Sequence, residues 1–160
     1  MTIFQILKTD HNNVKTILKR IEKLDETEQA ERLELFEQVK DELLIHLKAE
    51  EKAVYLKLKQ EDSTRELTFE ALEEHGLVQY LLQQIDSVDP EDERWSAKVT
   101  VLREVVEHHI NDEEKEIFPE MKKSFSSREL GEMAREMEAL KKERRIPGRR
   151  AFAKAGKRAA

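Results

Sequence analysis

The sequence predicts an all-α protein, and three observations support this fold class. Charged residues make up 40% of the 160 positions, and Gly and Pro together occupy only seven. This composition favours helices joined by short connections over a sheet. Apolar residues also recur at spacings of three and four along four long segments, which is the periodicity of amphipathic helices. Four such helices predict an up-down-up-down four-helix bundle.

The first two helices are predicted from a start signal and a regular inward stripe. Thr2, followed three residues later by Gln5, is a capping-box start for a helix that reaches about Leu24. A second helix is expected from about Thr27 to Lys59. Its stripe keeps the spacing of a bundle seam through Phe36, Val39, Leu43, His46, Glu50 and Ala53.

The next two helices also carry start signals. Ser63, with a Glu three residues on, starts a third helix that should end near Ser87. Asp89 as the cap, with Pro90 at the first helical position, starts a fourth. Pro119 is expected to end or kink this helix. The inward stripes are Leu72, His75, Val78, Leu82 and Ile85 on the third helix, and Leu102, Val106, His109, Glu113 and Ile117 on the fourth.

The C-terminal part divides into a short fifth helix and a basic tail. Ser126, with a Glu three residues on, predicts another capping box, and the apolar stripe that follows reaches Leu140. Pro147 and an Ala-, Lys- and Arg-rich composition then predict disorder. We therefore expect one domain over residues 1–143 and a disordered basic tail over residues 144–160.

Composition and charge exclude several classes of function. With no Cys, the chain cannot form disulfides, thiolate nucleophiles or cysteine-ligated metal sites. The net charge is -6, but residues 141–160 hold nine basic residues and one acidic residue, which leaves -14 on the rest. No nucleic-acid partner is expected for this acidic body, while the basic tail leaves contact with nucleic acid or an anionic membrane open.

The cellular location of the protein is predicted from the lack of targeting and membrane-spanning patterns. The first residues lack the basic start and apolar run of a signal peptide, and nowhere do 18 apolar residues follow one another. We expect a cytoplasmic protein without a transmembrane segment. The oligomeric state is left open.

The two halves of the chain repeat one another. HLKAEEKAVY at 46–55 and HINDEEKEIF at 109–118 share a His, three residues, Glu-Glu-Lys, two residues and an aromatic. DHNNVKTIL at 10–18 likewise aligns with EHGLVQYLL at 74–82. The first two helices therefore correspond to the next two. A pseudo-twofold bundle would bring equivalent positions towards a common centre.

Four of the five His lie at matching places in this repeat, on the inward stripes of four helices. Glu50 and Glu113 follow His46 and His109 by four residues and so share their helix faces. A buried carboxylate must be neutralised by a proton, an ion pair or a metal, and neither stripe offers a Lys or Arg beside it. We therefore predict a metal site with six candidate ligands: His11, His46, Glu50, His75, His109 and Glu113.

These ligands favour two transition-metal ions. Four imidazoles and two carboxylates are too many for one tetrahedral zinc, and too rich in nitrogen for calcium or magnesium. Because a Glu can bridge two metals through its two oxygens, we expect a dinuclear centre with two Glu bridges and about two His per ion. Iron fits such a mixed ligand set best, with manganese and zinc as alternatives. A purely structural polar core is the competing interpretation.

In these six residues the chain resembles the hemerythrin-like, or HHE cation-binding, domains. Their pattern of a His, H-x-x-x-E, a His and H-x-x-x-E on successive helices is met in order over roughly residues 1–143. The resemblance implies a four-helix bundle with a non-haem, oxo- or hydroxo-bridged diiron site that meets small oxidants. Oxygen-carrying hemerythrins have an H-x-x-x-H pattern on the third helix. In this chain the residue four positions before His75 is Ala71, and the residue four positions after it is Gln79. This departure argues against simple reversible oxygen carriage.

The expected function is therefore a diiron protein that binds, senses or scavenges dioxygen, peroxide or nitric oxide, which are its expected partners. Iron storage or a regulatory metal-binding role without redox turnover is the alternative. A catalase- or peroxidase-like activity at the diiron site stays open. No Ser-His-Asp or other nucleophilic arrangement is apparent in the sequence, so no catalytic residue is predicted.

His108 needs a separate interpretation because it is adjacent to His109 and points about 100° away around the helix. We interpret it as a helix-flank residue. A supporting or substitute ligand is the alternative, since Asp112 completes an H-x-x-x-D register with it.

Other neighbours of the ligands recur in both halves. Glu51 and Glu114 lie one residue past the candidate Glu ligands and are expected on the solvent side. Asp10 and Glu74 precede the first and third His and are expected to orient His ligands or to cap helices. The aromatic that ends each motif is interpreted as core packing, with a hydrogen-bonding or redox role for Tyr55 as the alternative.

Overall fold

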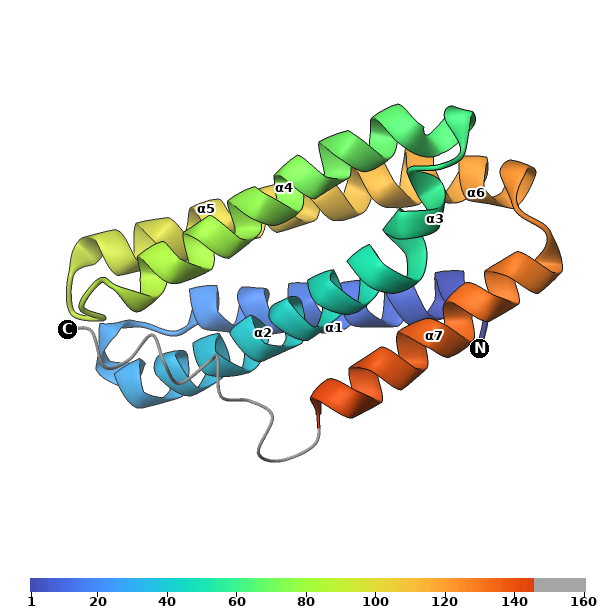
Figure 1. The fold of residues 1–160 in the computed structure, drawn as a ribbon. Coiled ribbons are helices and arrows are strands. Elements are labelled where there is room, and N and C mark those ends of the chain that lie inside the picture. Colours follow the sequence, from blue (N-terminus) through green and yellow to red (C-terminus); the bar gives the residue numbers. More distant parts are fainter. Residues whose placement is uncertain (146–160) are drawn as a thin grey trace.

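The fold is a four-helix bundle with a fifth helix, as predicted (Figure 1). The structure is a computed structural model that describes residues 1–145, and within that range it contains no strand. The four long helices are α1 (Ile3–Lys23), α2 (Gln29–Glu50), α4 (Asp62–Asp86) and α5 (Glu93–Asp112). A 3-10 turn, η1 (Glu26–Glu28), precedes α2, and α7 (Ser127–Arg144) is the fifth helix. The predicted disorder of the tail falls on residues outside the described range from 146 on.

Two helices continue beyond the candidate Glu ligands through π-helical turns. α2 passes through η2 (Glu51–Tyr55) into α3 (Leu56–Leu58), and α5 passes through η3 (Glu113–Ile117) into α6 (Phe118–Ser124). The two π turns occupy equivalent places in the sequence repeat. Such turns are rare inside helices and are frequent at functional sites.

Two of the predicted helix starts are wrong. α4 begins one residue before the predicted cap Ser63. The cap of α5 is Asp92, whose side chain accepts the backbone N–H of Arg94. The predicted cap, Asp89, instead closes a turn before the helix, where its side chain accepts the N–H of Glu91 at 2.9 Å. Two Asp residues three apart offered competing cap signals, and the second one prevails.

The other predicted start signals form, while two predicted ends differ. Thr2 and Ser126 each form a capping box at the starts of α1 and α7. α7 runs to Arg144, so the fifth helix is longer than predicted. Pro119, expected to end or kink the fourth helix, does not end it, because the chain stays helical to Ser124. Since Pro119 lies in the first turn of α6, directly after a π turn, its missing N–H is tolerated there.

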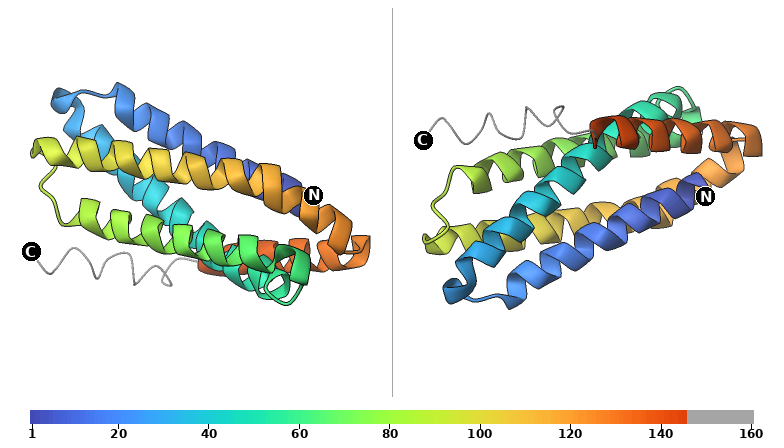
Figure 2. Two further views of the ribbon diagram at one scale, coloured as in Figure 1. Left: turned by 90° about the horizontal axis from the view of Figure 1, so that it is seen from above. Right: turned by 90° about the horizontal axis from the view of Figure 1, so that it is seen from below.

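The helices form two layers (Figure 1). α1 packs along α2, α4 packs along α5, and α1 also contacts α5 across the layers. α7 lies against α1, α2 and η2, near the N-terminus of the chain (Figure 2). None of the described helices combines the length and the hydropathy needed to span a bilayer.

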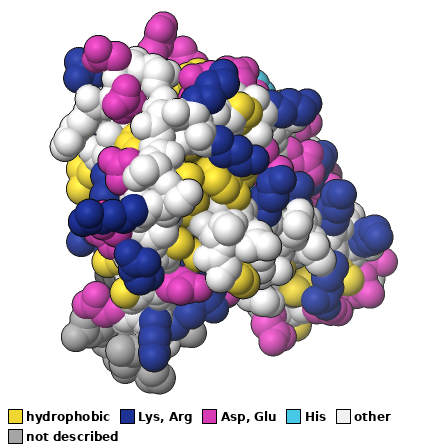
Figure 3. All heavy atoms as spheres, turned by 90° about the vertical axis from the view of Figure 1, so that its right-hand side faces the viewer, with side chains coloured by type: hydrophobic (Ala, Val, Ile, Leu, Met, Phe, Trp, Pro, Cys, Tyr) yellow, Lys and Arg dark blue, Asp and Glu magenta, His cyan; other side chains and the backbone are white. Residues whose placement is uncertain are grey.

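The apolar core has two clusters, one on each side of a polar layer. One cluster fills the end that holds the α1–α2 connection, with Leu18, Phe36, Trp95 and Leu102 among its members. The other fills the opposite end and is completed by Met133 and Met137 of α7. Along each long helix the predicted His and Glu ligands fall between the two clusters. His side chains barely show on the end face in Figure 3, in keeping with this buried layer.

Candidate metal centre

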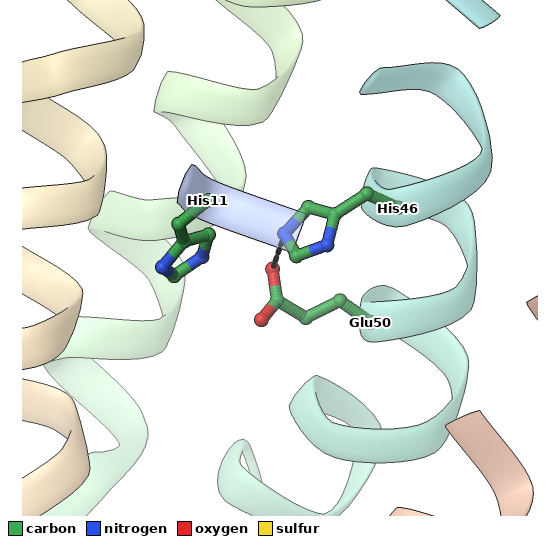
Figure 4. Close-up of side chains that lie close together, drawn as sticks. All are labelled: His11, His46 and Glu50. Carbon is green, nitrogen blue, oxygen red and sulfur yellow. Dashed lines mark ion pairs between the residues drawn. The ribbon is translucent and has the colours of Figure 1, made fainter. Parts of the chain in front are cut away.

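The six predicted ligands converge in the polar layer, and none is more than 4% exposed. Four long helices and one π turn supply them: α1, α2, α4, α5 and η3. Figure 4 shows three of them, with His11 of α1 facing His46 and Glu50 of α2. The sequence prediction that these side chains point inward is therefore confirmed. Their role as ligands stays a prediction.

Each Glu lies between two His residues from different helices. Oε2 of Glu50 lies 3.4 Å from Nε2 of His46 and 3.4 Å from Nε2 of His75. Oε2 of Glu113 lies 3.2 Å from Nε2 of His11 and 3.8 Å from Nε2 of His109. All four imidazoles thus turn the same nitrogen towards the two carboxylates. The geometry suits carboxylates that bridge two cations.

Two groups of three ligand atoms are compact enough to hold one ion each. His11, His46 and Glu50 form one group, and Glu50, His75 and His109 form the other, with all ligand atoms of a group within 4.8 Å of one another. The groups share Glu50. Its carboxylate therefore lies within reach of both groups.

Unpaired buried atoms support a cation at this place. Among the described residues, the buried side-chain atoms without a hydrogen-bond partner include Nε2 of His11, Nε2 of His46, both carboxylate oxygens of Glu50 and Oε2 of Glu113. Buried polar atoms are normally paired, because leaving one unpaired costs about 1–3 kcal/mol. Cations in the centre of the cluster would satisfy all of these atoms together.

The outward-facing nitrogen of every imidazole contacts an acidic side chain. Such a carboxylate accepts the Nδ1–H, which fixes the ring and directs Nε2 at the centre of the cluster. The contacts are His11 Nδ1 to Glu114 at 2.8 Å, His46 Nδ1 to Asp10 at 3.0 Å, His75 Nδ1 to Glu51 at 3.2 Å and His109 Nδ1 to Glu74 at 3.1 Å.

These contacts confirm one prediction and overturn another. Asp10 and Glu74 do orient His residues. Glu51 and Glu114 are not solvent-side residues, because their carboxylates reach His75 and His11 and their side chains are only about a quarter exposed (24% and 26%). Each lies in a π turn, where ideal α-helix spacing does not apply. The repeated Glu-Glu pair was the signal, since both of its members recur in the second half.

Charge interactions set the protonation of the metal-free cluster. Burial lowers the pKa of His46, but the charges of Glu50 and Asp10 outweigh it and raise this pKa to about 10. Burial opposes ionisation of Glu50 too, yet the neighbouring His46 and His75 hold its pKa well below the usual range. Burial and the like charge of Glu50 raise the pKa of Glu113. Protons therefore occupy the cluster where cations would bind.

Tyr55 breaks the symmetry of the cluster. It is fully buried, its hydroxyl donates to Oε1 of Glu113 at 3.3 Å, and its ring stacks on His75 with centroids 5.0 Å apart. Burial and the nearby charge of Glu113 raise the pKa of Tyr55 well above its usual value. Its counterpart, Phe118, has no hydroxyl, and its ring lies parallel to that of His11 with centroids 6.3 Å apart. The alternative prediction of a hydrogen-bonding Tyr55 is thus confirmed.

The outer carboxylates also differ in their second partners. Asp10 pairs with the ammonium of Lys141, which α7 supplies. Among residues 1–145 Glu74 has no ammonium partner, and it lies beside His108, whose side chain is 67% exposed. The prediction that His108 lies on the helix flank, outside the buried cluster, is therefore confirmed.

Comparisons with known proteins agree with this geometry. A family model described as the hemerythrin HHE cation binding domain matches residues 2–121, a range that holds all six candidate ligands. The crystal structure of a hemerythrin HHE cation binding domain-containing protein from Mycobacterium kansasii is similar, with a TM-score of 0.75 over 97% of this chain and 99% of that chain. At 23% sequence identity, this likeness shows a common fold.

A curated relative has a different description. A DNA nickase from Nostoc sp. (strain PCC 7120 / SAG 25.82 / UTEX 2576) is 26% identical over 144 residues, or 88% of this chain. The chain spans only 39% of the length of that nickase.

Proposed function

Because the chain belongs to the hemerythrin HHE cation-binding domain family, we propose that it holds two iron ions and uses them to bind, sense or scavenge dioxygen, peroxide or nitric oxide. The observation that carries this proposal is the pair of three-residue ligand groups that share Glu50, with unpaired buried atoms facing inward. Structural cores seldom leave so many polar atoms unpaired in one place.

The residues divide naturally between two ions. His11 and His46 would hold one ion, His75 and His109 the other, and both Glu50 and Glu113 would lie between them. Two nitrogens and two carboxylate oxygens give each ion four protein ligands. Iron in such mixed sites commonly accepts further ligands. A pair of iron ions supplies positions for a small oxidant and the electrons that reduce it.

The surrounding side chains would prepare the cluster for this chemistry. The four outer carboxylates contact Nδ1 of each His, so they direct Nε2 towards the centre and fix the orientation of the rings. The apolar clusters on both sides exclude bulk water, which strengthens electrostatic interactions in the layer. The hydroxyl of Tyr55 is a buried O–H donor next to Glu113. It could move a proton towards a reduced ligand.

The position of Ala71 favours reactivity over oxygen carriage. Oxygen-carrying hemerythrins have an H-x-x-x-H pattern on the third helix. In this chain Ala71 takes the place of the first His of that pattern and offers no ligand atom. One fewer imidazole leaves more room for exogenous molecules. Catalase- or peroxidase-like turnover is the enzymatic form of this proposal.

Iron storage or metal-dependent regulation without turnover is the second candidate, because the same buried ligands would serve it. Stopped-flow absorption separates the two. The proposal expects the bands of a bridged ferric pair to change when peroxide is added, and the reduced protein to change on exposure to air or nitric oxide. Bands that stay constant with all three reagents would leave only the storage or regulatory role.

A matched pair of variants makes this experiment specific. His109→Gln removes a candidate ligand, whereas His108→Gln changes the neighbouring exposed His on the same helix. We expect the spectral response to be lost in the first variant and retained in the second. Equal responses in both would contradict the assignment of His109.

DNA nicking is not carried over from the longer relative. The candidate ligands are buried inside residues 1–140, whose net charge of -14 would keep a phosphate backbone away from them. We expect supercoiled plasmid to stay intact with the iron-loaded protein. Relaxation of the plasmid that is lost in His109→Gln would contradict this expectation.

A further inference from the structure

A second group of metal-ligating side chains lies outside the buried cluster. Glu74 of α4 meets His108 and Asp112 of α5, and one ligand atom from each lies within 4.8 Å of the others. Nε2 of His108 is 3.1 Å from Oδ2 of Asp112 and 3.5 Å from Oε2 of Glu74. The three side chains are 67%, 39% and 23% exposed for His108, Asp112 and Glu74. Ions in solution can therefore reach them.

The chemistry of this group suits a divalent transition metal. One imidazole nitrogen and two carboxylate oxygens form the mixed ligand set that iron, manganese and zinc accept. His108 and Asp112 lie four residues apart, so they project side by side from one helix. Glu74 comes from the neighbouring helix α4, so two packed helices fix the spacing of the ligands.

The charge of the group is not compensated by a basic residue. In the described part of the chain, neither Glu74 nor Asp112 forms an ion pair with a Lys or Arg; His108 is their shared partner. Two neighbouring carboxylates attract a cation. A divalent ion would neutralise both.

The other half of the molecule shows a cation at the equivalent place. Asp10 corresponds to Glu74 in the repeat, and its second oxygen pairs with the ammonium of Lys141. The residues that correspond to His108 and Asp112 are Ile45 and Ala49, which cannot bind a metal. The surface group therefore belongs to one half only. The symmetry of the buried cluster does not explain it.

We propose that Glu74, His108 and Asp112 form a third, solvent-accessible divalent-metal site, distinct from the buried cluster. Glu74 joins the two regions, since Oε1 contacts His109 and Oε2 faces His108. The site takes a single Mn²⁺, Fe²⁺ or Zn²⁺ ion and completes its coordination with water.

A titration with Mn²⁺, followed by the electron paramagnetic resonance signal of the free ion, tests this proposal. We expect Asp112→Asn and His108→Asn each to bind one Mn²⁺ per chain fewer than the wild type. Glu74 is left unchanged because it also contacts His109. The matched control is Glu70→Gln, which removes the same charge from an exposed position one turn before Glu74 and should bind as the wild type does.

The comparison of variants does not depend on the buried cluster. Whether or not the inner ligands take metal, the difference of one ion between the wild type and Asp112→Asn is the same, so failure here and failure of the proposed function are distinguishable. Equal Mn²⁺ binding by the wild type and both variants would overturn the third site. A loss of equal size in Glu70→Gln would also overturn it, because general surface charge would then explain the binding.

Discussion

The two halves of the bundle repeat the ligands of the candidate centre but not their surroundings. Each half supplies two His, one inward Glu and two outer carboxylates at matching positions, and the Nδ1 contacts follow the same pattern in both. Two features are not repeated. Tyr55 stands where the second half has Phe118. Asp10 pairs with Lys141, whereas its counterpart Glu74 lies beside His108. The repeated residues are the ones that would hold the two proposed ions. The unrepeated ones make the surroundings of the two sides chemically different.

Glu50→Ala should have the largest effect, because Glu50 belongs to both ligand groups and its loss damages both halves together. We expect the variant to lose both ions and the stability that they confer. That stability is about 4 kcal/mol for each ion when free metal exceeds its Kd a thousandfold. Thermal melts with and without chelator measure it. A variant that still melts higher with iron than with chelator would contradict this role of Glu50.

Asp10→Asn and Glu74→Gln test whether the two halves are equivalent in their outer carboxylates. Each carboxylate holds Nδ1 of one His, so each change should lower metal affinity by about 10–100-fold. Competition with a coloured chelator measures the affinity. The exposed Glu70 of α4, changed to Gln, is the control. A loss in only one variant would show that one half binds its ion without this support.

The pH dependence of stability should differ between metal-free and metal-loaded protein. The pKa of His46 is about 10 in the folded metal-free protein, above its usual value of 6.5. Its contribution to stability is therefore fully present below pH 6.5 and is lost as the pH rises through 10. Urea unfolding with chelator should show this decline. His46→Gln should flatten it, and an equally steep decline in that variant would place its origin elsewhere.

Exchanging the unmatched aromatics should have the smallest effect on stability. Tyr55→Phe removes one buried hydrogen bond, worth about 0.5–1.5 kcal/mol, and makes the first half resemble the second. We expect metal content to stay the same while the rate of reaction with peroxide falls. Phe118→Tyr places a hydroxyl on the other side and is the reciprocal control. An unchanged rate in Tyr55→Phe would limit Tyr55 to packing.

The sequence was most informative where the signal was local or repeated. The capping boxes at Thr2 and Ser126 involve residues three apart, and both formed. The six candidate ligands could be identified because two carboxylates follow two inward His residues by four positions. Burying such carboxylates is costly unless a proton, an ion pair or a metal neutralises them. Burial of all six follows from the helix period alone.

Other features could not be read from the helix period. The π turns change the direction of Glu51 and Glu114, and a pattern based on ideal α-helices places both in solvent. Lys141 lies 131 residues from its partner Asp10, so only the packing of α7 on the bundle brings the two together. The hydrogen bond from Tyr55 to Glu113 likewise crosses from one half of the repeat to the other.

Anomalous diffraction at the iron absorption edge, on crystals of protein loaded with ferrous iron under nitrogen, is the most direct test of the buried centre. Two adjacent iron peaks between Glu50 and Glu113 are expected, each next to two of the four inward His residues. A single peak, or none, at full iron loading would contradict a dinuclear centre.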